Sequence, residues 1–266
     1  MTYDYEKIAT NFLELSSEQR LAIILRLLEN KSSVSKIAKE LQATVPEVYR
    51  NFARLAKADM VYKDSDGNYH LTTYGKTVTT CIPSLSFLSE NRKYFKEHDF
   101  GDIPQKFVQR IGALEDGKYV KGFSKVLQYW RDICQNAEQY IYDILYEEPL
   151  ELMEPIISKA KNDVKICSVF SESTIVPRGR KSIIDKSDVK KLIENNTIER
   201  KMKDSKVVVI LNEKEACVMF PTINGETDMS GTFYSQDPQF HDWCYDYFMH
   251  CWNTASTFHE HKIKEQ

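Results

Sequence analysis

The apolar positions between residues 33 and 75 follow a helical period and then an alternating one. A helix from Thr44 to about Lys57 is predicted because its apolar residues recur on one face at the 3.6-residue period. These apolar positions are Val45, Val48, Phe52 and Leu55. A shorter helix over 34–41 precedes it, and Gln42-Ala43 forms the turn. The runs 60–63 and 68–71 then flank Asp64-Ser65-Asp66-Gly67, which is typical of a β-hairpin.

Two helices joined by a tight turn and followed by a hairpin predict a winged helix-turn-helix. Helix-start signals support the pattern. Thr44 with Glu47 predicts a capping box, with Pro46 in the first turn, where its missing N–H costs little. Ser16 with Gln19 predicts a second capping box, at the start of a helix over 17–29.

The rest of the chain alternates between helical and strand periods. Helices are predicted at 5–15, 74–81, 85–96, 105–115, 123–137, 149–161, 186–196 and 238–255. Strands are predicted at 140–146, 164–170, 197–201, 207–211, 216–220 and 232–234. The run 207–211 is the most apolar, so we expect it at the centre of a sheet.

A chain of 266 residues is too long for one winged helix, so a further domain is expected. The predicted fold class is α+β. It comprises a winged helix-turn-helix domain over 1–80, a helical connector and dimerisation region over 81–138, and an α/β sensor domain over 139–266.

Charge is distributed unevenly along the chain. The formal net charge is −3, yet residues 31–80 carry eight basic and five acidic side chains. A basic segment on an acidic body suits phosphate binding. No apolar run reaches the roughly 18–20 residues of a membrane span, and the N-terminus lacks the pattern of a signal peptide. The six cysteines show no Cys-x-x-Cys spacing, which indicates reduced thiols in a cytoplasmic protein. No contact with membranes is expected.

The helix over 44–57 has the composition of a DNA recognition helix, and double-stranded DNA is the predicted partner. Arg50 or Arg54 can engage a guanine through two hydrogen bonds. The remaining predicted DNA-binding residues are Pro46, Glu47 and Tyr49 on the outer face, Lys36 with the helix starts at Ser33 and Thr44 for phosphates, and Lys63 to Asn68 at the hairpin tip. Asp64 and Asp66 are expected to form the turn. The alternative is a winged helix that contacts protein, with Arg50 and Arg54 simply solvated.

Two other clusters are candidate sites. Arg178, Arg180 and Lys181 follow a predicted strand and could hold an anion, and Tyr142 could line a metabolite pocket. A solvated loop is the alternative for the three cations. His241, Cys244, His250 and Cys251 share the last helix as a metal or redox candidate, but surrounding aromatic residues favour core packing, so no metal and no cofactor are predicted.

Several stretches carry a family resemblance. Leu71-Thr72-Thr73-Tyr74-Gly75 resembles the L-T-x-x-G that closes many archaeal winged-helix domains. Further similar stretches are 87–99, 103–114, 209–216 and 237–252. Together they resemble the archaeal winged-helix regulators named for the methanogenesis and filament-formation regulator, over most of residues 15–255. The resemblance implies a transcriptional regulator with a distantly phospholipase-D-like sensor or oligomerisation domain, as in sugar-responsive archaeal regulators.

Phospholipase-D-type hydrolysis requires a histidine in a His-x-Lys context. None of the six histidines lies two residues before a lysine, and no Gly-rich phosphate loop or other catalytic motif occurs. The chain is therefore predicted not to be an enzyme. The sequence predicts a homodimeric DNA-binding regulator that responds to a small-molecule effector. A protein-interaction module and a metal or redox sensor stay as alternatives.

Overall fold

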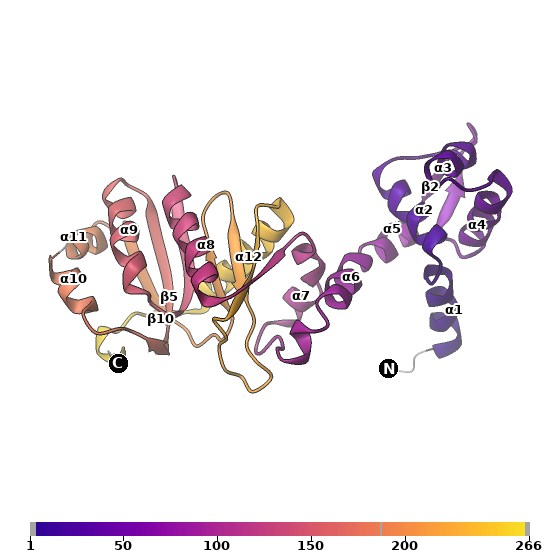
Figure 1. The fold of residues 1–266 in the computed structure, drawn as a ribbon. Coiled ribbons are helices and arrows are strands. Elements are labelled where there is room, and N and C mark those ends of the chain that lie inside the picture. Colours follow the sequence, from indigo (N-terminus) through magenta and orange to yellow (C-terminus); the bar gives the residue numbers. More distant parts are fainter. Residues whose placement is uncertain (1–3, 187, 264–266) are drawn as a thin grey trace. The chain divides into compact units, whose positions relative to one another are not determined.

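The chain divides into two compact units, residues 1–82 and 83–266 (Figure 1). The structure is a computed structural model that describes residues 4–186 and 188–263. In these residues, no helix is long and apolar enough to cross a membrane. Each unit has its own hydrophobic core, so each is described by itself.

Unit 1 contains the helices and the hairpin that the sequence predicts. Its elements are α1 (Tyr5–Leu15), α2 (Glu18–Glu29), α3 (Val34–Glu40), α4 (Val45–Lys57), β1 (Val61–Lys63), β2 (Tyr69–Leu71) and α5 (Thr73–Thr79). Strands β1 and β2 pair antiparallel, with Val61 opposite Leu71. Helices α2, α3 and α4 and the hairpin enclose one core.

The apolar stripe of α4 is buried except at its first residue. Val48, Phe52 and Leu55 are fully buried, whereas Val45 is 49% exposed. Val45 thus shares the predicted apolar stripe without being buried. Val45 is the first residue of α4 and lies on the apolar side of the helix. No preceding helical turn covers its side chain, so the side chain stays exposed.

Only one of the two predicted capping boxes forms. The carboxylate of Glu47 accepts hydrogen bonds from the Thr44 N–H (3.0 Å) and hydroxyl (2.7 Å), so the box that opens α4 is confirmed. The prediction for Ser16 and Gln19 is wrong, because α2 begins one residue later, with Ser17 at the N-cap. The Gln19 side chain instead accepts a hydrogen bond from Asn51 at 2.6 Å.

Unit 2 is built on an eight-stranded mixed sheet in the order β10-β6-β5-β4-β7-β8-β9-β3. Its strands are β3 (Lys118–Lys121), β4 (Tyr140–Glu147), β5 (Lys165–Ile175), β6 (Ile198–Met202), β7 (Val208–Leu211), β8 (Ala216–Met219), β9 (Gly231–Ser235) and β10 (Ser256–Thr257). Strands β4, β5 and β6 are mutually parallel, and the other pairings are antiparallel. The mixed sheet with its helices confirms the α+β class, and β7 lies centrally as predicted.

Helices cover both faces of this sheet. The α-helices of the unit are α6 (Ile82–Glu90, which begins at the unit boundary), α7 (Gln105–Val108), α8 (Phe123–Asn136), α9 (Leu150–Lys161), α10 (Arg180–Lys186), α11 (Val189–Glu194) and α12 (Pro238–Thr254). Short 3₁₀ turns are Tyr94–Lys96 (η1), Ile111–Leu114 (η2) and Glu260–Lys262 (η3). Val209 and Leu211 of β7 pack on the α12 side, while Val208 and Ile210 pack on the side of α8 and α9.

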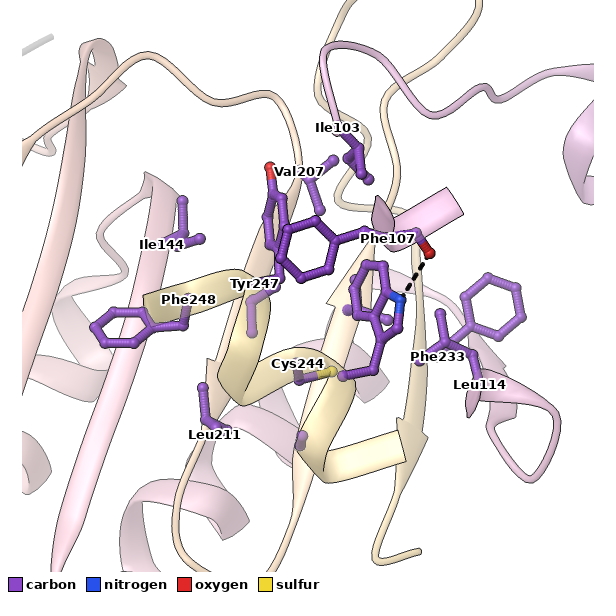
Figure 2. Close-up of a cluster of buried hydrophobic side chains, with 14 of the residues drawn as sticks. Ile103, Phe107, Leu114, Ile144, Val207, Leu211, Phe233, Cys244, Tyr247 and Phe248 are labelled. Atoms are coloured by element: carbon purple, nitrogen blue, oxygen red, sulfur yellow. Dashed lines mark hydrogen bonds between the residues drawn. The ribbon is translucent and has the colours of Figure 1, made fainter. Parts of the chain in front are cut away.

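Figure 2 shows the core on the α12 side of the sheet. Trp243 of α12 is fully buried, and its indole N–H donates a hydrogen bond to the Phe107 carbonyl at 3.1 Å. The same cluster includes Leu114 and Phe233. Segments far apart in the sequence therefore share one core, which attaches residues 87–114 to the sheet.

The structure divides residues 81–138 differently from the predicted connector. Phe87 and Ile111 are buried in the core of the sheet, β3 is an edge strand paired with β9, and α8 covers the opposite face. Residues 83–138 of the segment are thus part of unit 2. A second difference concerns the helix predicted over 186–196: the described part of it is the shorter α11, and α10 precedes it. Residue 187 lies outside the described residues.

Candidate nucleic-acid interface

Helix α4 carries an exposed polar and aromatic face opposite its buried stripe. Tyr49 is 57% exposed, and Pro46 and Arg50 are exposed beside it. Within residues 4–186 and 188–263, Arg50 forms no ion pair. The buried residues fix the helix against α2 and α3, so the orientation of this face is set by the core of unit 1.

The helix starts hold several of the predicted phosphate-binding residues. Ser33 caps α3, and its hydroxyl accepts a hydrogen bond from the Lys36 N–H at 3.4 Å. The Lys36 side chain is exposed. At the start of α4, the Thr44 hydrogen bonds lower the pKa of Glu47. Glu47 is therefore an ionised cap. Its carboxylate is already hydrogen-bonded to Thr44 and is not free to contact a DNA base.

Arg54 has a partner that the sequence pattern does not predict. Its Nη2 lies 2.7 Å from Glu14 Oε1 and its Nε 3.1 Å from Glu14 Oε2, a two-point ion pair with α1. The hydrogen bond from Arg54 is the main cause that lowers the pKa of Glu14. Glu14 also pairs with the buried Arg20. Arg54 would have to leave this carboxylate before it could contact a base.

Asp64 organises the hairpin tip, as the sequence analysis expects for this residue. Its carboxylate accepts hydrogen bonds from the backbone N–H groups of Asp66 (3.0 Å) and Asn68 (2.8 Å) and from the His70 ring (2.7 Å). The His70 hydrogen bond is the main cause that lowers the pKa of Asp64 to about 2. Asn68 is half-buried, so its backbone serves the turn.

The hairpin also presents a basic and an aromatic side chain. Lys63 is exposed, with its Nζ 5.8 Å from the centre of the Tyr69 ring. Tyr62 is 51% exposed and stacks on His70 with ring centres 5.1 Å apart. Tyr62 is not among the predicted DNA-binding residues. Strand alternation places its side chain on the other face of β1 from the buried Val61, and this was a usable signal.

The four predicted ligand-binding residues do not come together. Arg178 and Lys181 are exposed, whereas Arg180 is only 4% exposed and pairs with Glu148 and Glu260. Tyr142 lies on the other face of the sheet, stacked on Phe248 of α12. Strand alternation causes this separation, because even-numbered residues at the start of β4 face α12.

The alternative metal site does not assemble either. Cys244 and Cys251 are fully buried in the core, and His241 Nε2 lies 2.7 Å from the Asn212 carbonyl oxygen. Among the described residues, no three His, Cys, Asp or Glu side chains group as metal ligands would. Burial raises the pKa of the Cys251 thiol to about 11, so it is protonated at neutral pH.

Residues 118–259, just over half of the chain, match the family described as "Transcriptional regulator TrmB, EBD N-terminal subdomain". The chain belongs to this family. Membership confirms the coarse form of the resemblance, a transcriptional regulator. The narrower assignment to the methanogenesis and filament-formation regulators stays a prediction.

Solved structures with some likeness to the chain are distant. TrmBL2, described as an archaeal chromatin protein with a novel mode of DNA binding, is 11% identical, with a TM-score of 0.40 over 90% of this chain and 92% of that one. The phospholipase D family member Nuc from Salmonella typhimurium is 15% identical, with a TM-score of 0.39 over 55% of this chain and 100% of that one.

NucT from Helicobacter pylori is 12% identical, with a TM-score of 0.40 over 54% of this chain and 100% of that one. Likenesses this weak do not support an argument about function or about a phospholipase-D-like domain. No protein with a curated description matches the chain.

Proposed function

We propose that this TrmB-family regulator binds double-stranded DNA through unit 1, with α4 as the recognition helix of a winged helix-turn-helix. One observation carries the proposal. The buried stripe of Val48, Phe52 and Leu55 anchors α4 while Tyr49 and Arg50 stand exposed on its outer face. The major groove of DNA admits an α-helix that is anchored in this way. The exposed arginine and aromatic side chains of the helix can then contact the base edges.

Arg50 is the first candidate for a base contact, because Arg54 is held by Glu14. Lys36 and the helix starts at Ser33 and Thr44 suit phosphates, which fix register and not sequence. Lys63 suits a contact with the DNA backbone beside the hairpin. The exposed methyl groups of Val45 support an apolar contact with a thymine methyl.

The remaining parts of the proposal concern assembly and chemistry. A homodimer would present two recognition helices to half-sites about one helical turn apart. Unit 2 would act as the sensor domain for a small-molecule effector.

We also propose that the chain is not an enzyme. His98 supports this view, because its ring bonds to the Tyr94 carbonyl and to Asp228 inside the fold. Absence of phosphodiester hydrolysis by the purified protein would agree with it.

The decisive experiment starts by selecting bound sequences from a random duplex library with the full chain. Affinity for the selected site is then measured by fluorescence anisotropy. Arg50→Ala should weaken binding about 5- to 150-fold, the equivalent of about 1–3 kcal/mol for one base contact. Arg92→Ala removes the same charge from an exposed position in unit 2 and serves as the matched control.

Salt dependence separates DNA binding from the protein-interaction alternative. The logarithm of affinity should fall with the logarithm of salt concentration, with a slope of roughly −0.9 per neutralised phosphate. If no sequence is enriched and the affinity for duplex DNA does not depend on salt, unit 1 contacts protein instead. If a site is enriched but Arg50→Ala binds it like the wild type, the assignment of the recognition face is wrong.

A further inference from the structure

A partly open cavity lies between the sheet of unit 2 and the helices on the α9 side. Its volume is about 70 Å³, and it is lined by side chains from α8, α9, α10, α11 and the strands β4 to β7. Most of the lining is aliphatic or aromatic, including Met153, Phe170 and Ile184. Cavities with apolar walls and a few convergent polar groups are the usual form of a small-molecule site.

Two residues of the lining each have a buried polar atom without a hydrogen-bond partner among the described residues. These atoms are Nε1 of Trp130, which is fully buried, and Oδ1 of Asp143, which is 1% exposed. The second oxygen of Asp143 accepts a hydrogen bond from the Ser168 hydroxyl at 3.1 Å. Buried polar atoms are nearly always paired in folded proteins, so an unpaired donor and carboxyl oxygen beside one cavity indicate a missing polar group.

Two arginines line the same cavity. Arg180 is buried and pairs with Glu148 and Glu260, and Arg200 lies 2.9 Å from the other oxygen of Glu260. Both arginines also line a second pocket of about 430 Å³ that includes Glu260. The arginine pair therefore belongs to the linings of both pockets, and one carboxylate, Glu260, bridges the two arginines.

Glu260 is the replaceable member of this group. Its side chain is 56% exposed, and it belongs to the three-residue turn η3, which follows the two-residue strand β10. Glu148, by contrast, is 17% exposed and stays beside Arg180. Without Glu260, two arginines would face one carboxylate, which leaves one positive charge for an incoming anion. Arginine binds carboxylates strongly because its planar donors match both oxygens.

We propose that this cavity binds a small monocarboxylate that has an apolar chain and a terminal hydroxyl or carbonyl oxygen. Its carboxylate takes the place of Glu260 on Arg180 and Arg200. The chain passes along the apolar walls, and the terminal oxygen pairs with Trp130 and Asp143. The cavity of about 70 Å³ has room for about two water molecules at roughly 30 Å³ each, so it takes only the far end of the ligand.

This binding site stands apart from the proposed DNA contacts, because every residue in it belongs to unit 2. Its test therefore uses the full chain without DNA. A failure here would leave the DNA proposal unaffected, and a failure of DNA binding would leave this site unaffected.

The test compares three probes of equal chain length by isothermal titration calorimetry. The first, 6-hydroxyhexanoate, offers both functional groups and should bind one molecule per chain. Hexanoate lacks the hydroxyl and should bind about three- to tenfold more weakly, the loss expected for one neutral hydrogen bond. The diol 1,6-hexanediol lacks the carboxylate and should show no binding over the same concentrations.

Three variants assign the binding to this cavity. Glu260→Gln removes the competing charge and should tighten binding of both acids about tenfold. Trp130→Phe removes only the indole donor and should bring the hydroxy acid down to the affinity of hexanoate. Glu151→Gln removes a carboxylate from an exposed ion pair with Arg131 and should change nothing.

Two results would overturn the proposal. One is the absence of 6-hydroxyhexanoate binding to both the wild type and Glu260→Gln at tens of millimolar, which would indicate that water alone fills the cavity. The other is equal binding of the acid and the diol, since the arginines would then have no part in recognition. If Trp130→Phe does not fold, the wild-type probe series and Glu260→Gln still decide the question.

Discussion

Gly75 is the position in unit 1 at which one added methyl group should be most harmful. It lies in the first turn of α5, directly after the hairpin. A Cβ at this position would lie 2.0 Å from the Met60 carbonyl oxygen and 2.9 Å from its carbonyl carbon. Met60 is fully buried, so neither backbone can move away without disturbing the core. Gly75→Ala is the corresponding perturbation.

The magnitude follows from the contacts that have to give way. An ordinary contact begins near 3.4 Å, so the two backbones must separate by more than an ångström. Overpacking of this kind costs about 1–3 kcal/mol. The Met60 carbonyl accepts a hydrogen bond from the Thr72 N–H at 3.0 Å, and loss of that bond adds about 1 kcal/mol. The better helix propensity of alanine returns about 1 kcal/mol. The net loss should be about 1–3 kcal/mol of the free energy of unfolding of unit 1.

Hydrogen exchange with mass spectrometry on the full chain can measure this loss separately for each unit. Amides of α2 and α4 should exchange about 5- to 150-fold faster in Gly75→Ala, while amides of β7 should not change. Lys76→Ala alters the next, exposed residue of the same helix and should have little effect. Wild-type protection of α4 in Gly75→Ala would refute the argument from close approach.

Two further predictions concern charge in unit 1. Because the pKa of Asp64 is lowered from 3.8 to about 2 in the folded hairpin, Asp64 stabilises unit 1 above about pH 4, and this contribution is lost as the pH falls through 2. In Asp64→Asn, the free energy of unfolding of unit 1, measured by urea unfolding, should therefore fall less between pH 5 and pH 2 than in the wild type. If it falls equally in both proteins, the role of the His70 hydrogen bond is contradicted. Glu14→Gln should release Arg54 for a phosphate contact. The slope of the logarithm of DNA affinity against the logarithm of salt concentration should then become more negative by roughly 0.9. An unchanged slope in the anisotropy assay would mean that Arg54 stays away from the phosphates.

Structural features that depend on residues a few positions apart can be predicted from the sequence. Helix α4, the hairpin and the Thr44 capping box follow from the 3.6-residue period and from contacts three residues apart. The L-T-x-x-G motif also has a local basis. The Thr72 hydroxyl accepts a hydrogen bond from the Gly75 N–H at 2.9 Å, and Gly75 permits the approach to Met60.

Strand β3 and the site residues show where local patterns end. Strand β3 was missed because its partner, β9, lies more than a hundred residues later, and only that pairing makes it a strand. The same reason applies to Arg54, whose partner Glu14 is forty residues away, and to Arg180, for which the sequence leaves an anion site and a solvated loop open.

The sequence by itself determined the local elements of this protein and the basic, aromatic character of α4. The tertiary structure decided which of the arginines are engaged, that Tyr142 and Arg180 lie on different sides of the sheet, and that Trp130 and Asp143 share a cavity. The physical reason is the range of the interactions. Backbone hydrogen bonds and side-chain period act over a few residues, whereas burial and ion pairing depend on segments brought together by the whole fold.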